Sequence, residues 1–114
     1  MLGFIFVGHF FADFVCQTRQ MGDNKSKSFY WLSVHIVAYT IALGLSTFFI
    51  FENFVTFTLW LLLNSFLHLC TDFVTSKTTS FFYKKQNWYW FWTVIGLDQL
   101  IHIMTLYYTF LWIK

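Results

Sequence analysis

Four long apolar stretches alternate with three short polar connections along the chain. The apolar stretches cover residues 2–20, 29–51, 54–76 and 88–113. Each is close to the roughly 20 residues that an α-helix needs to cross a hydrocarbon core about 30 Å thick. Because backbone polar groups cannot stay unpaired in lipid, each stretch is expected to be helical. The pattern predicts an all-α integral membrane protein, a single domain over residues 1–114 with four transmembrane helices.

The composition indicates the same environment. The 114 residues are 58% hydrophobic and only 11% charged, whereas a soluble domain carries about 25% charged residues. The lipid bilayer is therefore the expected partner of the helix surfaces. The net charge of +2 is small and no helix face carries a basic stripe, which excludes nucleic acid as a partner.

Basic residues predict how the chain is oriented. They gather in the polar connections at 18–28 and 76–87, while the connection at 51–53 has none: Arg19, Lys25, Lys27, Lys77, Lys84 and Lys85. By the positive-inside rule, these two connections face the cytoplasm. The expected location is the cytoplasmic (inner) membrane, with both termini outside.

Polar side chains recur on one face of each apolar stretch. One histidine falls in each stretch, and three of the four have an aspartate four positions away, on the same helix face. The resulting polar stripes are His9, Asp13 and Gln17; His35 and Tyr39; Asn64, His68 and Asp72; and Asp98, Gln99 and His102. Counted at about 1.5 Å per residue from the helix ends, their depths are similar enough for the groups to converge.

Such residues are costly inside a bilayer. An isolated charge near the bilayer centre costs roughly 2.5–3.5 kcal/mol on insertion scales. Interhelical polar contacts that only hold a bundle together stabilise it by about 0.6–2 kcal/mol. If packing were their only role, leucine would be favoured at these positions. A functional polar site explains the stripes better than structural pairing does.

A short repeat suggests internal symmetry. The motif H-x-x-x-D-F-V occurs at His9 and again at His68, 59 residues later, and each copy precedes a basic connection. The two helices with matching motifs are expected to run in the same direction. This pattern is typical of two pseudo-symmetric helix pairs related by an axis along the membrane normal. The repeat thus predicts two half-sites that face each other.

The motifs GHFFADFVCQ, HLCTDFVTSK and LDQLIH, with His35 and Tyr39 between them, resemble a family of small bacterial and phage membrane proteins known as a domain of unknown function. The resemblance covers nearly the whole chain. It implies an integral membrane protein in which these positions recur: His9, Asp13, Gln17, His35, His68, Asp72, Lys77, Asp98, Gln99 and His102. A fainter similarity links the H-x-x-x-D helices to membrane-bound metal-dependent hydrolases.

Histidine and carboxylate ligands suit Zn, Mn or Fe. The expected metal ligands are His9, Asp13, His68, Asp72, Asp98 and His102. Gln17, Asn64 and Gln99 are expected to orient these ligands. Lys77 is expected to reach the lipid head groups, or to contact an anionic lipid or substrate phosphate.

Two functions of different classes follow from this site. The first is a metal-dependent hydrolase of a lipid-linked ester or phosphoester, in which Asp13, Asp72 and His35 carry the catalysis and one of them acts as general base. The alternative is a small proton- or cation-coupled membrane transporter that acts as a homodimer, because relays of intramembrane His and Asp often carry protons. A transporter needs a site reachable from both faces of the membrane, whereas a hydrolase needs access from one.

Overall fold

The computed structural model describes residues 1–114 and is helical throughout, without strands. The helices are α1 (Leu2–Phe10), the π-helical segment η1 (Phe11–Val15), α2 (Arg19–Asn24), α3 (Phe29–Thr47), the 3₁₀ turn η2 (Phe48–Ile50), α4 (Phe54–Lys84) and α5 (Trp88–Ile113). The all-α prediction is confirmed.

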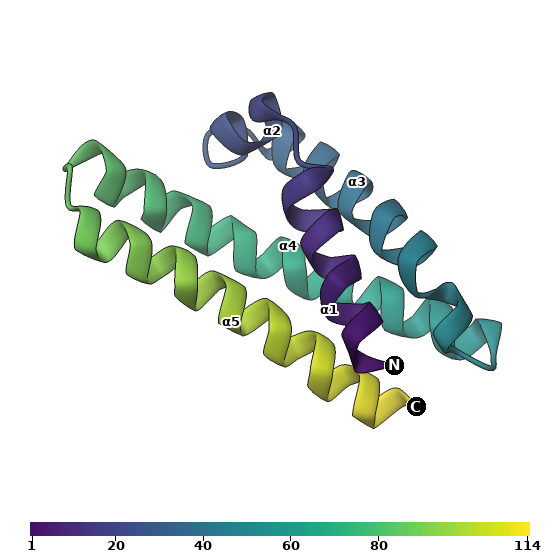
Figure 1. Cartoon of the computed structure of the whole chain (residues 1–114). Helices are drawn as coiled ribbons and strands as arrows, with labels where there is room; N and C mark the ends of the chain where they lie inside the picture. Colours follow the sequence, from purple (N-terminus) through teal and green to yellow (C-terminus); the bar gives the residue numbers. More distant parts are fainter.

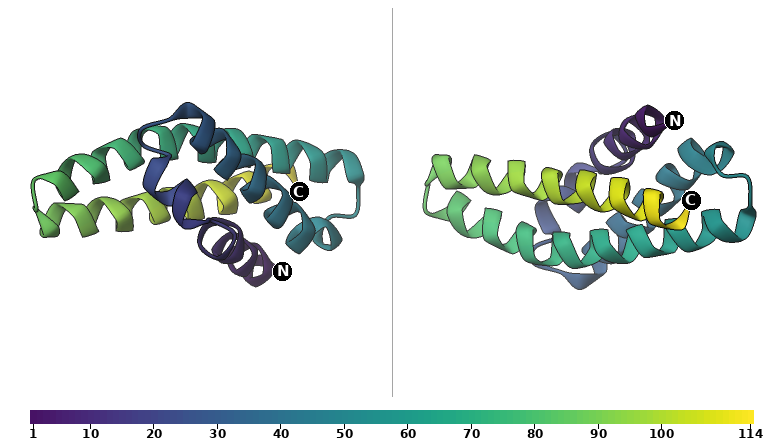
Figure 2. Two further views of the ribbon diagram at one scale, coloured as in Figure 1. Left: turned by 90° about the horizontal axis from the view of Figure 1, so that it is seen from above. Right: turned by 90° about the horizontal axis from the view of Figure 1, so that it is seen from below.

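Helices α4 and α5 form a long antiparallel hairpin that sets the shape of the molecule (Figure 1). Helix α4 has 31 residues, and at about 1.5 Å per residue it runs for about 46 Å, close to the 47 Å long axis of the whole chain. Helices α1 and α3 lie beside the half of the hairpin nearer the two termini, and the α4–α5 turn projects beyond them (Figures 1 and 2). The short helix α2 lies above the hairpin where this projecting end begins (Figure 1).

Three segments are long and apolar enough to cross a membrane: Phe29–Ile50, Phe54–Lys84 and Trp88–Ile113. The first apolar segment is shorter than predicted, because its helix covers only Leu2–Val15. The chain leaves the helix after Val15, and the Thr18 side chain accepts a hydrogen bond from the Met21 amide at 3.3 Å to begin α2. The structure therefore supports three of the four predicted spans.

Helix α4 continues beyond the predicted end at residue 76. The segment from Ser76 to Lys84 was expected to be a polar connection, yet it is helical, and only the turn at 85–87 links α4 to α5. This segment contains neither glycine nor proline, so polarity alone does not end the helix. The added turns place serine and threonine side chains on a helix face instead of in a loop.

The predicted pairing of two similar halves is not confirmed. The first copy of the repeat lies in a short helix with a π-helical end, whereas the second lies in the middle of the 31-residue α4. Corresponding residues of the two motifs still meet at one site, which is described below.

The interior is more polar than the surface. Eleven polar or charged residues are buried, against nine hydrophobic ones, while many phenylalanine, leucine and tryptophan side chains are exposed. A protein folded in water shows the reverse distribution, and the exposed apolar surface suits contact with lipid. The small apolar core lies around Ile5, Leu43, Trp60 and Leu106.

Gly8 lets α1 approach α3 closely. A Cβ atom at this position would lie 2.8 Å from Ser46 Oγ and 3.1 Å from Ser46 Cβ. We expect Gly8→Ala to destabilise the protein by about 1–3 kcal/mol, because the added methyl group pushes the two helices apart. Unfolding of the purified protein in detergent micelles measures the change. Gly96→Ala is the matched control, since nothing lies within 4 Å of its Cβ position, and an equal loss in both variants would contradict the close approach.

Candidate metal site

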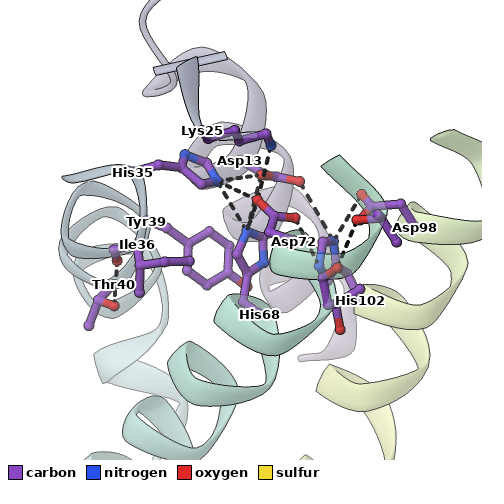
Figure 3. A network of polar contacts seen from close by, with 12 residues as sticks. Asp13, Lys25, His35, Ile36, Tyr39, Thr40, His68, Asp72, Asp98 and His102 are labelled. Atoms are coloured by element: carbon purple, nitrogen blue, oxygen red, sulfur yellow. Dashed lines mark hydrogen bonds and ion pairs between the residues drawn. The ribbon is translucent and has the colours of Figure 1, made fainter. Parts of the chain in front are cut away.

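Seven predicted ligand and catalytic residues converge between the helices, and Figure 3 labels all of them except His9. Each is at least nine-tenths buried, with exposures of 8% or less. They come from α1, η1, α3, α4 and α5: His9, Asp13, His35, His68, Asp72, Asp98 and His102. The buried His/Asp groups that could hold a metal ion all belong to this set.

Four of these residues direct one atom each toward a common point. His35 Nε2 and His68 Nε2 lie 3.2 Å apart. Asp13 Oδ1 lies 3.2 Å from the first nitrogen and 3.3 Å from the second. Asp72 Oδ2 lies 3.2 and 3.4 Å from the same two atoms. The two aspartates of the repeated motif thus face the same pair of imidazoles.

These separations fit one small ion. A tetrahedral Zn²⁺ ion with bonds of about 2.0–2.1 Å holds its ligand atoms about 3.3–3.4 Å apart, and the five separations above span 3.2–3.4 Å. Ca²⁺ requires six to eight oxygen ligands at about 2.3–2.6 Å, and Mg²⁺ requires octahedral oxygen ligands. The donor set of two nitrogens and two oxygens therefore suits a transition metal.

Aromatic packing fixes the imidazole of His68. The Tyr39 ring stacks on the His68 ring with centroids 3.9 Å apart, and the His102 ring also stacks on the His68 ring, with centroids 4.0 Å apart. The Tyr39 hydroxyl also lies 3.3 Å from His9 Nδ1, within hydrogen-bond distance. Tyr39 therefore restrains two histidines of the site at once.

Gln99 connects three cluster residues. Its side-chain amide donates to Asp13 Oδ2 and to Asp98 Oδ2, both at 3.0 Å, and its oxygen lies 3.1 Å from His9 Nε2. Asp13 thus offers one oxygen to the four-atom group and the other to Gln99. Gln99 thus holds the side chains of His9, Asp13 and Asp98 in place, and its role toward a bound metal stays a prediction.

His102 has the least satisfied side chain of the cluster. Both ring nitrogens are buried without a hydrogen-bond partner, although Nδ1 lies 3.5 Å from Asp98 Oδ2 and Nε2 lies 3.5 Å from Asp72 Oδ1. An unpaired buried polar atom costs about 1–3 kcal/mol. His102, Asp72 and Asp98 therefore form a second group that could hold a cation.

Sequence reasoning missed Lys25. Its ammonium group reaches from the segment after α2 and donates to Asp72 Oδ2 at 3.0 Å, the same oxygen that belongs to the four-atom group. The lysine side chain is only 17% exposed. The connection that holds Lys25 was interpreted only as evidence of membrane orientation. The spacing rules of a helix do not say which helix face a residue in a connection reaches.

The π-helical turn η1 was also missed. The Cys16 amide bonds to the Phe11 carbonyl five residues earlier at 2.9 Å, which widens the turn that carries Asp13. Such single turns are rare and frequently occur at functional sites. The widened turn lets Asp13 reach the four-atom group while it stays 3.8 Å from His9.

The remaining predicted residues lie around the cluster or away from it. Gln17 lines a cavity beside the cluster, but its buried oxygen bonds to none of the ligands. Asn64 donates to the Trp60 carbonyl and to Thr109 Oγ1, both outside the cluster. Lys77 lies over the Phe73 ring and donates to the Ser26 carbonyl at 3.3 Å. None of these three forms a hydrogen bond with a ligand of the four-atom group.

A cavity of about 650 Å³ leads from the cluster to the surface. Asp13, Asp98 and Gln99 line its inner part, and residues of the segment after α2 and of the extended half of α4 line the rest. The four-atom group is thus reached through Asp13, the one member that faces the cavity.

A family model described as "Protein of unknown function (DUF3307)" matches residues 1–113. The chain belongs to this family, and the resemblance found in its sequence motifs is confirmed. No curated protein and no solved structure matches the chain.

Lys25 is expected to stabilise the metal-free site and to compete with a metal ion. Replacing it by Met leaves the buried Asp72 carboxylate without its lysine partner, and loss of one member of a buried pair costs about 3 kcal/mol. We expect Lys25→Met to lower stability in EDTA and to raise the affinity for Zn²⁺. Unfolding and Zn²⁺ titration in micelles measure both effects. Lys85→Met is the control, and equal behaviour of the two variants would contradict this role.

Proposed function

We propose that the chain is an integral membrane protein that binds a divalent transition metal, Zn²⁺ best, and hydrolyses a lipid-linked ester or phosphoester. The observation that carries the proposal is the convergence of four ligand atoms from His35, His68, Asp13 and Asp72: five of their six separations are 3.2–3.4 Å, and all lie within 4.8 Å. A metal ion at the common point would neutralise the two buried carboxylates, of which Lys25 pairs with only one.

Charge supports the same assignment. Two carboxylates carry two negative charges and neutral histidines carry none, so the group balances one divalent ion. Neither Cys16 nor Cys70 belongs to the group, and both are exposed. The ligand set therefore favours Zn²⁺, Mn²⁺ or Fe²⁺ over Cu⁺, which prefers sulfur.

The arrangement of the cavity favours hydrolysis. A divalent ion held by the four atoms would have to accept a water molecule as a fifth ligand, and it would then supply Lewis acidity and a nucleophile at neutral pH. Asp13 would be the ligand on the substrate side, because it lines the cavity. Asp98 lines the same cavity outside the four-atom group and would act as general base, while Thr75 and Gln99 hold its two oxygens. In this arrangement His35 is a ligand, which replaces the general-base role expected from its sequence.

One-sided access argues against the transporter alternative. The second cavity, of about 230 Å³, lies at the opposite end of the molecule and is lined by residues such as Glu52, Phe110 and Lys114. It includes no residue of the His/Asp cluster. The buried side chains of Trp60, Leu106 and Phe110 belong to the apolar core beyond the cluster. A site that is reached from one end only suits an enzyme better than a transporter.

We further propose that the two basic connections face the cytoplasm and that both termini lie outside. Lys84 ends α4 and Lys85 begins the turn to α5, which is followed by the exposed aromatic residues Trp88, Tyr89, Trp90 and Trp92 that suit a membrane interface. Lys25 and Lys27 lie beside the same projecting half of the hairpin, since they line one cavity with Lys84. All these basic residues therefore belong to one end of the molecule.

Metal binding tests the four-atom group directly. The purified protein is expected to retain one Zn²⁺ ion per chain, and saturation at one hundred times the dissociation constant stabilises it by about 2.7 kcal/mol. Asp13→Asn and Asp72→Asn keep the side-chain size but lose the anionic ligand. Elemental analysis and thermal unfolding should show that both variants lose the ion and the stabilisation. Glu52→Gln, in the opposite connection, is the control. A wild-type protein without a Zn²⁺-dependent shift would overturn the proposal.

The hydrolytic step has a separate test. Asp98→Asn is expected to keep the Zn²⁺ ion but to lower the rate of cleavage by about 100-fold or more, because a general base contributes that much. A panel of lipid-linked esters and phosphoesters, assayed with the Zn²⁺-loaded protein, measures the rate. If the loaded protein cleaves none of them, the hydrolase assignment fails and the metal site stands by itself.

Orientation can be tested with single engineered thiols. In a background with Cys16 and Cys70 replaced by serine, a cysteine at residue 27 should resist an impermeant reagent added outside cells. A cysteine at residue 52 should be labelled. The reverse pattern would show that the basic connections face outward.

A further inference from the structure

The outer part of the 650 Å³ cavity is lined by cations and hydroxyl groups. Lys27 and Lys84 contribute ammonium groups from two segments that are distant in the sequence, while Lys25 lines the cavity with its ammonium group bound to Asp72. Hydroxyls come from Ser26 and from the face of α4 that holds Ser76, Thr79 and Ser80. Such a lining of ammonium and hydroxyl donors is typical of a site for an oxyanion such as phosphate.

The charges are arranged along the cavity. Asp13 and Asp98 lie at its buried inner end, whereas Lys27 and Lys84 are exposed at the outer end. Neither of these two lysines forms an ion pair within the chain. Asp23 also lines the outer part, but its carboxylate lies 3.6 Å from Arg19 Nε. The outer part therefore offers unpaired positive charge to a ligand.

Ser76 provides an independent indication of a ligand. Its side chain is 7% exposed and lines the cavity, yet its hydroxyl has no hydrogen-bond partner. The neighbouring hydroxyl of Thr75 bonds to Asp98, and that of Thr79 bonds to the Ser76 carbonyl. Because a buried hydroxyl without a partner costs free energy, Ser76 is suited to donate to a group that enters the cavity.

Apolar side chains complete the cavity wall. Phe14, Phe91 and Ile95 line it together with the polar groups, and Phe14 is 49% exposed on the outer surface of η1. A purely polar solute would gain nothing from this wall. An amphiphile could place its polar group among the lysines and its hydrocarbon chain along the phenylalanines.

We propose that this cavity binds the phosphate-bearing head group of a membrane amphiphile, which rests on the proposed function because it names the substrate class of the same site. The phosphate lies between Lys27 and Lys84 with the Ser76 hydroxyl as a further donor, while Lys25 stays paired with Asp72. The head group fills the space toward Asp13 and Asp98. The cavity volume of about 650 Å³ lies within the roughly 300–1,000 Å³ of small-molecule sites and exceeds what a phosphate ion alone would fill.

Binding can be measured without catalysis. The full-length protein in neutral detergent micelles with EDTA is titrated with fluorescent dioleoyl phosphatidic acid, with a dioleoylglycerol that carries the same label, and with sn-glycerol 3-phosphate. We expect the phosphatidic acid to bind at least about tenfold more tightly than the diacylglycerol, because only it engages the lysines. Competition by glycerol phosphate would indicate that the phosphate group suffices, and absence of competition would indicate that the acyl chains are also required. Equal affinity for the two lipids overturns the proposal.

Two adjacent lysines supply a matched pair of variants. Lys84→Gln removes a cavity cation and should weaken phosphatidic acid binding about tenfold, whereas Lys85→Gln removes the same charge outside the cavity and should leave the affinity unchanged. Ser76→Ala should weaken binding as well, while Thr78→Ala, whose hydroxyl bonds to the Val74 carbonyl, should not. If Lys84→Gln and Lys85→Gln behave alike, the effect is nonspecific attraction and the site is refuted.

The two proposals fail in different ways. His35→Gln should lose Zn²⁺ and keep metal-free binding of phosphatidic acid, because His35 neither lines the cavity nor pairs with a lysine. Lysine-dependent lipid binding by a protein that never binds Zn²⁺ would refute the metal centre alone. A stoichiometric Zn²⁺ ion without lysine-dependent lipid binding would refute the head-group site alone.

Discussion

The structure depends on the need to neutralise two aspartates that are buried side by side. Asp13 and Asp72 each approach the same two histidine nitrogens to within 3.4 Å. Taking a charged carboxylate out of water costs several kcal/mol even after relaxation, and two like charges add repulsion. Lys25 supplies one compensating charge, and a divalent ion would supply two. The helices therefore have to meet where both carboxylates can share cationic partners.

The same constraint explains how the helices recognise one another. Lipid is as apolar as leucine, so the apolar surfaces gain little by packing together in a bilayer. Specific association must come from close packing and from polar contacts, and the interior buries more polar residues than hydrophobic ones. Gly8 allows α1 to approach α3, and the π-helical turn brings Asp13 to the histidines. The local irregularities of the first helix thus serve the polar cluster.

Much of the site could be predicted because helical periodicity relates sequence spacing to a helix face. His68 and Asp72, or Asp98 and His102, stand four residues apart, and the two faces turn toward one another, since His102 Nε2 lies 3.5 Å from Asp72 Oδ1. Asn64 occupies the same face as His68 but lies one turn away, where it bonds to Thr109. Depth along a helix, unlike face, depends on how helices tilt and where they end. Lys25 illustrates the other limit, because its position depends on the path of a connection.

The misjudged end of α4 has the largest consequence for function. Read as a connection, Ser76 and Lys84 would belong to a solvated loop with no fixed relation to the cluster. As helix, the same residues form a rigid wall that projects past α1 and α3 and encloses a cavity with the segment after α2 (Figure 1). The polar side chains of Ser76–Lys84 were interpreted as the point where the chain leaves the membrane, but several of them line the cavity that leads to the buried carboxylates. An apolar core lies at the other end, so the 650 Å³ cavity is the route to the buried carboxylates that the structure describes.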